Sequence, residues 1–312
     1  MNLPTASFRF SGHETFVCRY SWLPKVIREI GNAPNLFTDD DNAMVALGVG
    51  KNMVRSIRFW AESAQVIEQV QKPAGYRTSE FGQQLLGHDG HDAFLEDPRT
   101  LWLLHWKIAT NPTQPLFFWH QLLNYWHRAD FSESEILPFF LKNAPATSNL
   151  RSESTIEQGY RVFVNTYVPS RGKKGHIAED NLDSPFVELD LVRRIGDRRA
   201  AEDESREVIY GFNLEDKTAV TAELFAYCLN EYWQNVYPDE HTLPFRAITA
   251  GPGSPGQIFK LPELAVRRHL ELLKQVSGGA FSFEESTTIQ QAVRKKRVSP
   301  EALLDRVYSF QD

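Results

Sequence analysis

Apolar residues recur with a helical period along residues 37–67, "FTDDDNAMVALGVGKNMVRSIRFWAESAQVI", and this pattern predicts two short helices. Thr38 or Asp39 can cap the first helix, and acidic residues fill its opening turn, where the helix dipole favours negative charge. The sequence Gly-Val-Gly at 48–50 supplies a tight turn. We therefore expect the second helix to cover about residues 51–65.

The next stretch predicts a β-hairpin followed by a short helix. Residues 66–70, "VIEQV", are typical of a strand, and Lys-Pro-Ala-Gly at 72–75 is typical of a turn into a second strand. A helix, a glycine turn, a second helix and a hairpin, in that order, indicate a winged helix-turn-helix. The whole unit would span roughly residues 35–90.

The remainder of the chain predicts further helices and one small sheet. The expected elements are helices within 96–141, 154–168 and 221–237, a hairpin made of 186–192 and 207–214, a Gly/Pro loop at 250–261, and a final helical section that carries the basic run 294–297. The expected fold class is mainly α with a small β content (α+β). We expect an N-terminal domain at 1–95 with the winged helix-turn-helix and a larger, mainly helical domain at 96–312.

Composition limits the class of protein. The 312 residues are 42% apolar and carry a formal net charge of −6, which fits a packed globular protein. The negative net charge excludes nucleic-acid binding by the whole surface but allows a local basic face. Cys18 and Cys228 form neither a metal motif nor a disulfide framework, and no signal peptide or membrane-spanning stretch is visible, so we expect a cytoplasmic protein.

The second predicted helix is amphipathic, with one cationic side. On a helical wheel, five residues lie within about 60° of Arg55: Lys51, Asn52, Arg58, Phe59 and Glu62. The opposite side carries Met53, Ile57, Trp60, Ala61 and Ala64, which predicts a buried face. Phe59 would then be an exposed aromatic ring that needs a covering partner.

A cationic helix after a glycine turn fits reading of the DNA major groove. Arg55 or Arg58 could bond guanine, Asn52 could bond adenine, and Lys51 could contact a phosphate. In the wing, Lys72 and Arg77 could add backbone contacts. Two alternatives stay open: a solvated charged face, and a helix-turn-helix used for protein contacts.

The N-terminal stretch "FSGHETF" places a histidine and a glutamate side by side. Ser11 and Glu14 match the spacing of a helix capping box, in which Glu14 bonds a backbone N–H and His13 points outward. The functional alternative makes His13 a base or phosphate ligand at a helix N-terminus, with Glu14 beside it and Arg19 as a second cation. These two readings are compatible, because a cap would order the turn that holds the site.

Other candidates are weaker. His120, Asn124 and His127 share a helical face without a local acid, which favours core or interface residues. Glu188 and Asp190 alternate on a predicted strand and could bind Mg²⁺, but no nuclease core surrounds them. The glycine-rich loop near Lys260 lacks the ending of a P-loop, although its N–H groups could hold a phosphate. No metal ligands are assigned, and the cofactor is left open with Mg²⁺ as the candidate.

Four blocks of the sequence together resemble one bacterial protein family. The blocks are "FSGHETF", "LGVGKNMVRSIRFW", "DPRTLWLLHW" and "GPGSPGQIFKL", and the resemblance covers nearly the whole chain. The family is found beside DNA phosphorothioation genes, and its best-described branch is the nickase component of the single-strand (Ssp) phosphorothioation system. Its shared motif corresponds here to Ser11, Gly12, His13, Glu14 and Phe16, and its helix-turn-helix to residues 48–60.

The resemblance implies a function and a set of partners. The function is binding of double-stranded DNA and nicking of one strand for sulphur insertion, within a sulphur-modification and phage-defence pathway. The implied partners are a cysteine desulfurase, an ATP-pyrophosphatase-like protein and an ATPase. The resemblance brings no settled catalytic set, so His13, Glu14 and Arg19 are assigned from the sequence pattern alone. The alternatives are a non-catalytic DNA-binding adaptor that recruits the sulphur-transfer proteins, and a transcriptional regulator.

Overall fold

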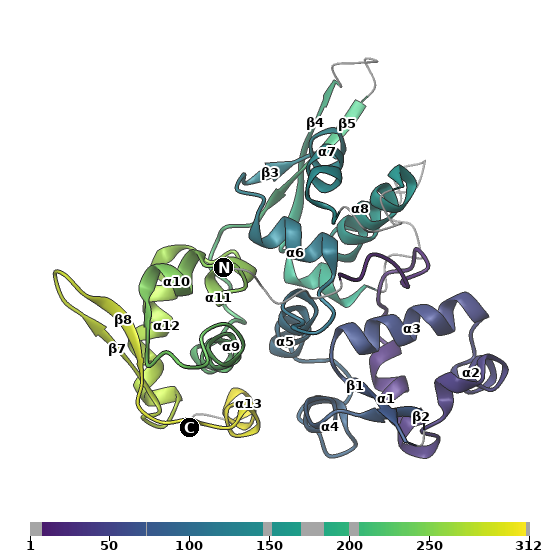
Figure 1. The fold of residues 1–312 in the computed structure, drawn as a ribbon, viewed down its shortest axis with the longest axis horizontal. Coiled ribbons are helices and arrows are strands. Elements are labelled where there is room, and N and C mark those ends of the chain that lie inside the picture. The colour runs from purple at the N-terminus through teal and green to yellow at the C-terminus, as the bar shows by residue number, and fades with distance from the viewer. Residues whose placement is uncertain (1–7, 73, 146–151, 170–183, 200–205, 310–312) are drawn as a thin grey trace.

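The computed structural model describes residues 8–72, 74–145, 152–169, 184–199 and 206–309. The chain is mainly helical and carries three small antiparallel sheets, with strand orders β1-β2, β3-β5-β4 and β6-β8-β7 (Figure 1). The predicted α+β class is confirmed. Among the described residues, no helix combines the length and the apolar character that crossing a membrane requires.

The N-terminal elements are α1 (Trp22–Asn32), η1 (Leu36–Thr38), α2 (Asp40–Leu47), α3 (Lys51–Ser63), β1 (Ile67–Gln71), β2 (Ala74–Thr78) and α4 (Glu80–Leu86). From α2 onward, they follow the order predicted from the sequence, and α1 and η1 precede them. Asp39 caps α2, since its Oδ1 accepts from the N–H groups of Asp41 (3.0 Å) and Asn42 (3.3 Å). Gly48 ends α2 with a φ of 64°, a left-handed conformation that favours glycine.

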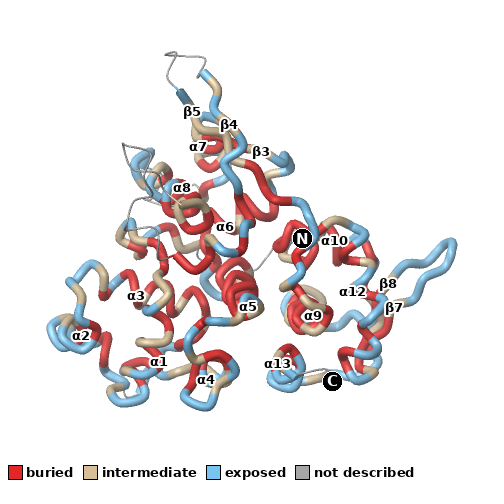
Figure 2. The backbone as a smooth tube through the Cα atoms, turned by 180° about the vertical axis from the view of Figure 1, so that it is seen from behind, coloured by how far each residue is buried: buried red, intermediate tan, exposed pale blue. Residues whose placement is uncertain are grey.

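The central elements pack around one buried helix. They are α5 (Pro98–Ala109), α6 (Phe117–Asn124), β3 (Asp130–Phe131), α7 (Glu133–Asn143), α8 (Glu153–Tyr167), η3 (Pro185–Leu189), β4 (Val192–Arg199) and β5 (Arg206–Phe212). Every residue of α5 from Thr100 to Ala109 is buried, and the helix lies at the centre of the molecule (Figure 2). Its apolar residues on all sides explain this position, since such a helix must be enclosed by neighbours.

The C-terminal elements form a third group on the other side of α5 (Figure 1). They are α9 (Ala222–Val236), β6 (Thr242–Pro244), α10 (Phe245–Ala250), α11 (Pro255–Ile258), α12 (Glu263–Val276), β7 (Phe281–Glu285), β8 (Gln290–Arg294) and α13 (Pro300–Tyr308). Cys18 and Cys228 are both buried free thiols, as expected, and burial raises the pKa of each. The domain boundary at residue 95 stays a prediction.

Two sequence-based assignments are wrong. Residues 185–189 form a short 3₁₀ turn instead of a strand, because Asp190 adopts a left-handed φ of 48° and the strand begins only at Val192. Glu188 and Asp190 therefore do not alternate along a strand: Glu188 accepts from the Tyr20 hydroxyl, and Asp190 pairs with Arg193. The basic run at 294–297 lies at the end of β8 and in the loop after it, not on a helix.

The contact between α8 and α6 yields a stability prediction. A Cβ on Gly159 in α8 would lie 1.9 Å from the Phe118 ring, so Gly159→Ala should lower the free energy of unfolding by about 1–3 kcal/mol. The matched control is Gly31→Ala in α1, where no heavy atom lies within 4 Å and where alanine should stabilise by about 0.5–1 kcal/mol. Urea unfolding measures the free energy of unfolding of both variants. Equal changes relative to the wild type would contradict the packing of α8 on α6.

Candidate nucleic-acid interface

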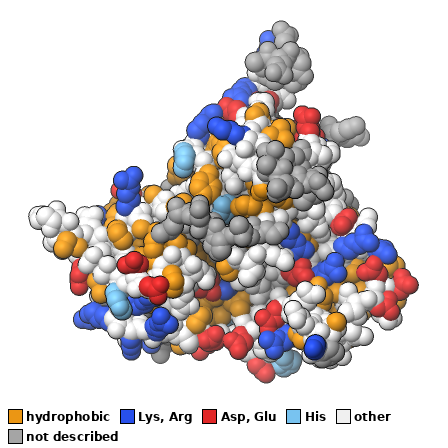
Figure 3. Space-filling model, viewed as in Figure 1, with side chains coloured by type: hydrophobic (Ala, Val, Ile, Leu, Met, Phe, Trp, Pro, Cys, Tyr) orange, Lys and Arg blue, Asp and Glu red, His pale blue; other side chains and the backbone are white. Residues whose placement is uncertain are grey.

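The outward face of α3 carries the predicted cations. Lys51, Asn52 and Arg55 are exposed and Arg58 is half-buried, so other described parts of the chain leave most of this face open. Lys and Arg side chains gather over α3 in the space-filling view (Figure 3). The four residues come together because they share one side of a single helix, as the 3.6-residue period requires.

The opposite face of α3 holds the helix on the core. Val54, Ile57, Trp60 and Ala61 are buried. The Trp60 ring packs edge-on against Trp119, and its Nε1 donates to the Phe16 carbonyl at 3.0 Å, so its one polar atom is satisfied. These contacts fix which side of α3 faces solvent.

An acidic side chain from α2 stands beside the basic face. Asp40, at the start of α2, forms an ion pair with Lys51 at 3.0 Å. The hydrogen bond from Lys51 lowers the pKa of the Asp40 carboxyl, and the charges of Arg55 and Arg58 act in the same direction. Part of the positive charge on this face is therefore offset before any ligand arrives.

The expected exposure of Phe59 is wrong. Phe59 is 1% exposed because the N-terminal segment covers it. The Arg9 guanidinium lies 4.2 Å from the centre of its ring, and the His13 ring meets it edge-on at 5.5 Å. A helical wheel describes one helix alone and cannot include a segment that packs onto it from elsewhere in the chain.

The same N-terminal segment connects α3 to α6. The Arg9 N–H donates to the Pro115 carbonyl at 3.0 Å, and the Phe117 N–H donates to the Arg9 carbonyl at 3.1 Å. The Arg9 guanidinium forms an ion pair with Glu62 of α3 at 2.8 Å. Because Phe59 lies one turn beyond Arg55 and next to Arg58, the segment that covers it borders the basic face.

The predicted capping box at Ser11–Glu14 is wrong. Residues 11–15 form a loop, and α1 begins only at Trp22. Gly12, Glu14 and Thr15 have φ values of 113°, 48° and 70°, which no right-handed helix allows. Backbone strain of this kind at non-glycine residues is concentrated at functional sites, so the loop remains a candidate despite the lost cap.

His13 is buried inside this loop. It is 3% exposed, and its Nδ1 accepts from the Thr15 N–H at 3.2 Å. Burial, with a smaller effect from the Arg9 charge, lowers its pKa to about 4, so the ring is neutral at neutral pH with its proton on Nε2. That nitrogen has no hydrogen-bond partner among the described residues. Glu14 is half-buried beside it.

The other proposed residues occupy different surroundings. Arg19 lies after the loop, with its guanidinium 5.6 Å from the Trp22 ring. Lys72 is exposed at the end of β1. Arg77 is opposite Glu68 across the β1–β2 hairpin and forms an ion pair with it, which neutralises much of its charge. No described residue forms an ion pair with Lys72, the other cation of the wing.

The weaker sequence candidates do not form a ligand site. Asn124 is buried and accepts the Gly253 N–H at 2.7 Å, whereas His127 is exposed. Burial lowers the pKa of His120 to about 4, as expected of a core histidine. Lys260 is also buried: its Nζ donates to the Leu123 carbonyl at the end of α6 at 2.7 Å and lies 4.6 Å from the centre of the Phe212 ring, so its ammonium points into the protein.

Sequence reasoning missed Arg9, whose signal is its position between two aromatic residues in Phe-Arg-Phe. It also missed Lys107 and Glu231, which form a buried ion pair between α5 and α9. These two residues stand 124 positions apart, so no local pattern connects them. Within the described part of the chain, no group of three or more His, Cys, Asp or Glu residues could hold a metal ion.

Comparison with known proteins assigns the family. Residues 10–308 match the model of the family described as "Protein of unknown function (DUF4007)", and the chain belongs to this family. Two solved structures share the fold: a magnesium ion-bound SspB structure at 23% identity and an SspB structure at 24% identity. Each has a TM-score of 0.80, with 96% of this chain and 86% of that chain covered. No curated protein matches the sequence.

The buried His13 yields a pH prediction. Its folded pKa of about 4 lies below the unfolded value of about 6.5, so its contribution to stability is complete above pH 6.5 and is lost as the pH falls toward 4. In His13→Asn the amide oxygen can still accept the Thr15 N–H. Between pH 7 and pH 5, the unfolding free energy of the wild type should therefore fall by about 1–2 kcal/mol more than that of the variant.

Urea unfolding at both pH values measures this difference. The pKa of His105 is also lowered to about 4, so the wild type and the variant should both keep a residual pH dependence. If the wild type and His13→Asn lost the same unfolding free energy between pH 7 and pH 5, His13 would not be buried and neutral.

Proposed function

We propose that this protein binds duplex DNA through the outward face of α3, as a component of a DNA phosphorothioation system. The observation that carries the proposal is the open cationic stripe of Lys51, Asn52, Arg55 and Arg58 on a helix held rigidly by its buried side. The sequence resemblance to the Ssp nickase component and the SspB-like fold both support the assignment to such a system. The partners would be a cysteine desulfurase, an ATP-pyrophosphatase-like protein and an ATPase.

The dimensions of α3 suit the major groove. Thirteen residues make a helix about 20 Å long, and the groove is about 12 Å wide. In this proposal Asn52 and Arg55 read base edges, while Lys51 at the helix start contacts a phosphate. The Lys51–Asp40 ion pair must loosen for that contact, so part of the binding energy is used to separate it.

We further propose that the protein nicks one strand, with His13, Glu14 and Arg19 as the candidate catalytic residues. The strained loop that carries His13 and Glu14 borders the basic face, so a bound strand would pass beside it. His13 could act as a base only if the loop opened and released its unprotonated Nδ1 from the Thr15 N–H, because the ring is enclosed by Phe59 and the loop backbone. Mg²⁺ is the candidate cofactor, but no described group of ligands fits it, and no step is assigned to it.

A non-catalytic adaptor is the second candidate. The burial of His13 and the lack of a metal-binding cluster among the described residues favour this alternative. An adaptor would use the α3 face to hold DNA and another surface to hold its partners. A transcriptional regulator is less favoured, because some 220 further residues are packed behind the helix-turn-helix region.

Two substitutions on α3 test DNA binding. Arg55→Ala should weaken binding of a labelled duplex by about 1–3 kcal/mol and relax sequence preference if Arg55 reads a base. Lys51→Ala should lower the slope of log affinity against log salt by about one unit if Lys51 contacts a phosphate. The control is Lys142→Ala, which removes an exposed cation from α7. Equal effects in all three variants, or no binding at low ionic strength, would refute the α3 interface.

A plasmid assay separates the nickase from the adaptor. With Mg²⁺ present, the wild type should convert supercoiled plasmid to the open circle, and His13→Asn and Glu14→Gln should lose this activity while keeping DNA affinity. Gel electrophoresis with and without a chelator measures the product. Binding without nicking under every condition would support the adaptor, and a fully active His13→Asn would remove His13 from the catalytic set.

A further inference from the structure

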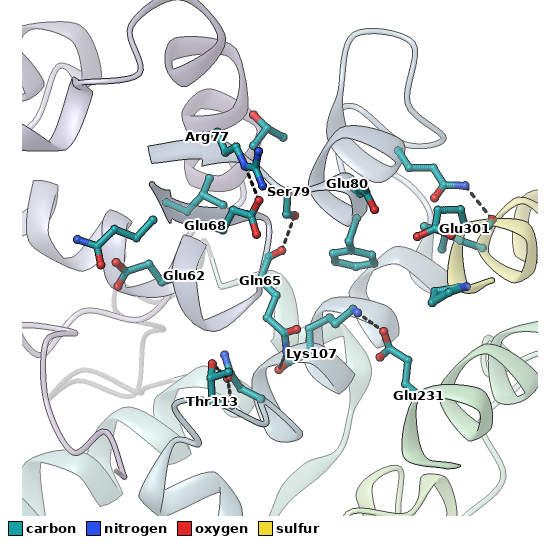
Figure 4. A pocket seen from close by; sticks show the side chains of 18 of the residues that line it. Glu62, Gln65, Glu68, Arg77, Ser79, Glu80, Lys107, Thr113, Glu231 and Glu301 are labelled. Atoms are coloured by element: carbon teal, nitrogen blue, oxygen red, sulfur yellow. Dashed lines mark hydrogen bonds and ion pairs between the residues drawn. The ribbon is translucent and has the colours of Figure 1, made fainter. Parts of the chain in front are cut away.

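A pocket of about 760 Å³ lies on the side of the molecule where the N-terminal elements meet the C-terminal ones. Its walls come from the β1–β2 hairpin, α4, α5, α9 and α13 (Figure 4). The volume falls in the range of pockets that bind ligands. The DNA proposal does not use this pocket, and the inference below holds whether or not α3 binds DNA.

The floor of the pocket shows how the cavity accommodates a cation. The Lys107 ammonium pairs with the Glu231 carboxylate and lies 4.4 Å and 5.3 Å from the ring centres of Phe81 and Tyr227. Glu231 also accepts from Trp106 Nε1 at 2.7 Å and from the Tyr227 hydroxyl at 2.9 Å. A carboxylate and two aromatic rings thus enclose an ammonium group. The Glu231 carboxylate already accepts hydrogen bonds from the side chains of Trp106 and Tyr227.

The rim carries excess negative charge. The lining contains five glutamates against one arginine and one lysine. Glu62 pairs with Arg9 and Glu68 with Arg77, but no described residue forms an ion pair or a side-chain hydrogen bond with the carboxylate of Glu80 or Glu301. Acidic side chains gather between α13 and α4 in the space-filling view (Figure 3). Glu80 on α4 and Glu301 on α13 lie near each other on one side of the cavity (Figure 4).

We propose that this pocket docks a basic segment of a partner protein, with a lysine or arginine side chain entering between Glu80 and Glu301. The charge of the rim repels phosphate, so nucleic acid does not fit. Gln69 and Gln114 add exposed primary amides to the walls, and amides can donate to and accept from a peptide backbone. This combination favours a peptide over a free polyamine, which would leave the amides unused.

The test uses the full chain and a fluorescently labelled hexa-arginine peptide, with binding followed by anisotropy at low ionic strength. The pocket variant is Glu80→Gln with Glu301→Gln. The matched control is Glu153→Gln with Glu263→Gln, which removes the same charge. All four glutamates are exposed and lie in the first turn of a helix, so both variants lose the same favourable dipole interaction.

The peptide should bind the wild type and the control with equal affinity, and the pocket variant about five- to tenfold more weakly. Equal weakening in both variants would show attraction by the whole acidic surface and overturn the proposal. Failure of the peptide to bind the wild type would also overturn the proposal. So would a competition assay in which spermine displaces the labelled peptide as well as an unlabelled arginine peptide of equal charge does. DNA is absent from the assay, so its result is separate from that of the α3 variants.

Discussion

The burial of Phe59 and Trp60 under the N-terminal segment is the interaction on which the α3 surface depends. Trp60 points into the core from the side of α3 away from Arg55, and Phe59 is covered one turn beyond Arg55 on the same side. The part of α3 that stays open carries Lys51, Asn52 and Arg55. Trp60 is held by the Phe16 carbonyl and Trp119, while Phe59 is covered by Arg9 and His13. The core and residues 9–16 therefore help to set the orientation of the cationic face.

Arg9 makes this arrangement energetically acceptable. Desolvation lowers the pKa of its guanidinium, while the ion pair with Glu62 opposes that effect. A buried charge is tolerated only when it is paired and hydrogen-bonded, and Arg9 gains both a carboxylate and an aromatic face. Glu62 in turn accepts from the Tyr76 hydroxyl at 2.9 Å, so the N-terminal segment, α3 and the hairpin share one small polar network. Gly12 belongs to the same contact, since a Cβ there would lie 2.9 Å from the Phe59 ring.

Local sequence signals were sufficient where neighbours in the chain decide the structure. The Asp39 cap, the Gly48 turn, the start of α3 and the β1–β2 hairpin all follow from residues within a few positions. Local sequence signals failed where segments distant in the chain decide the structure. Ser11 and Glu14 have capping-box spacing, but packing on α3 imposes left-handed angles instead, and Phe59 is covered by a segment nearly fifty positions away. The Lys107–Glu231 pair could not be predicted for the same reason, since only the packing of α5 on α9 brings it together.

The acidic start of α2 shows how folding and ligand attraction compete on one surface. Asp39 caps the helix and Asp40 and Asp41 complement its dipole, which stabilises the element that precedes the turn into α3. Of these carboxylates, Asp40 pairs with Lys51 and reduces the positive potential that a phosphate backbone would meet. A protein with a net charge of −6 and an offset basic face gains little from general electrostatic attraction. If the proposed DNA binding holds, sequence selectivity would come from hydrogen bonds to base edges, and the burial of Phe59 and Trp60 would fix the direction of the side chains that make them.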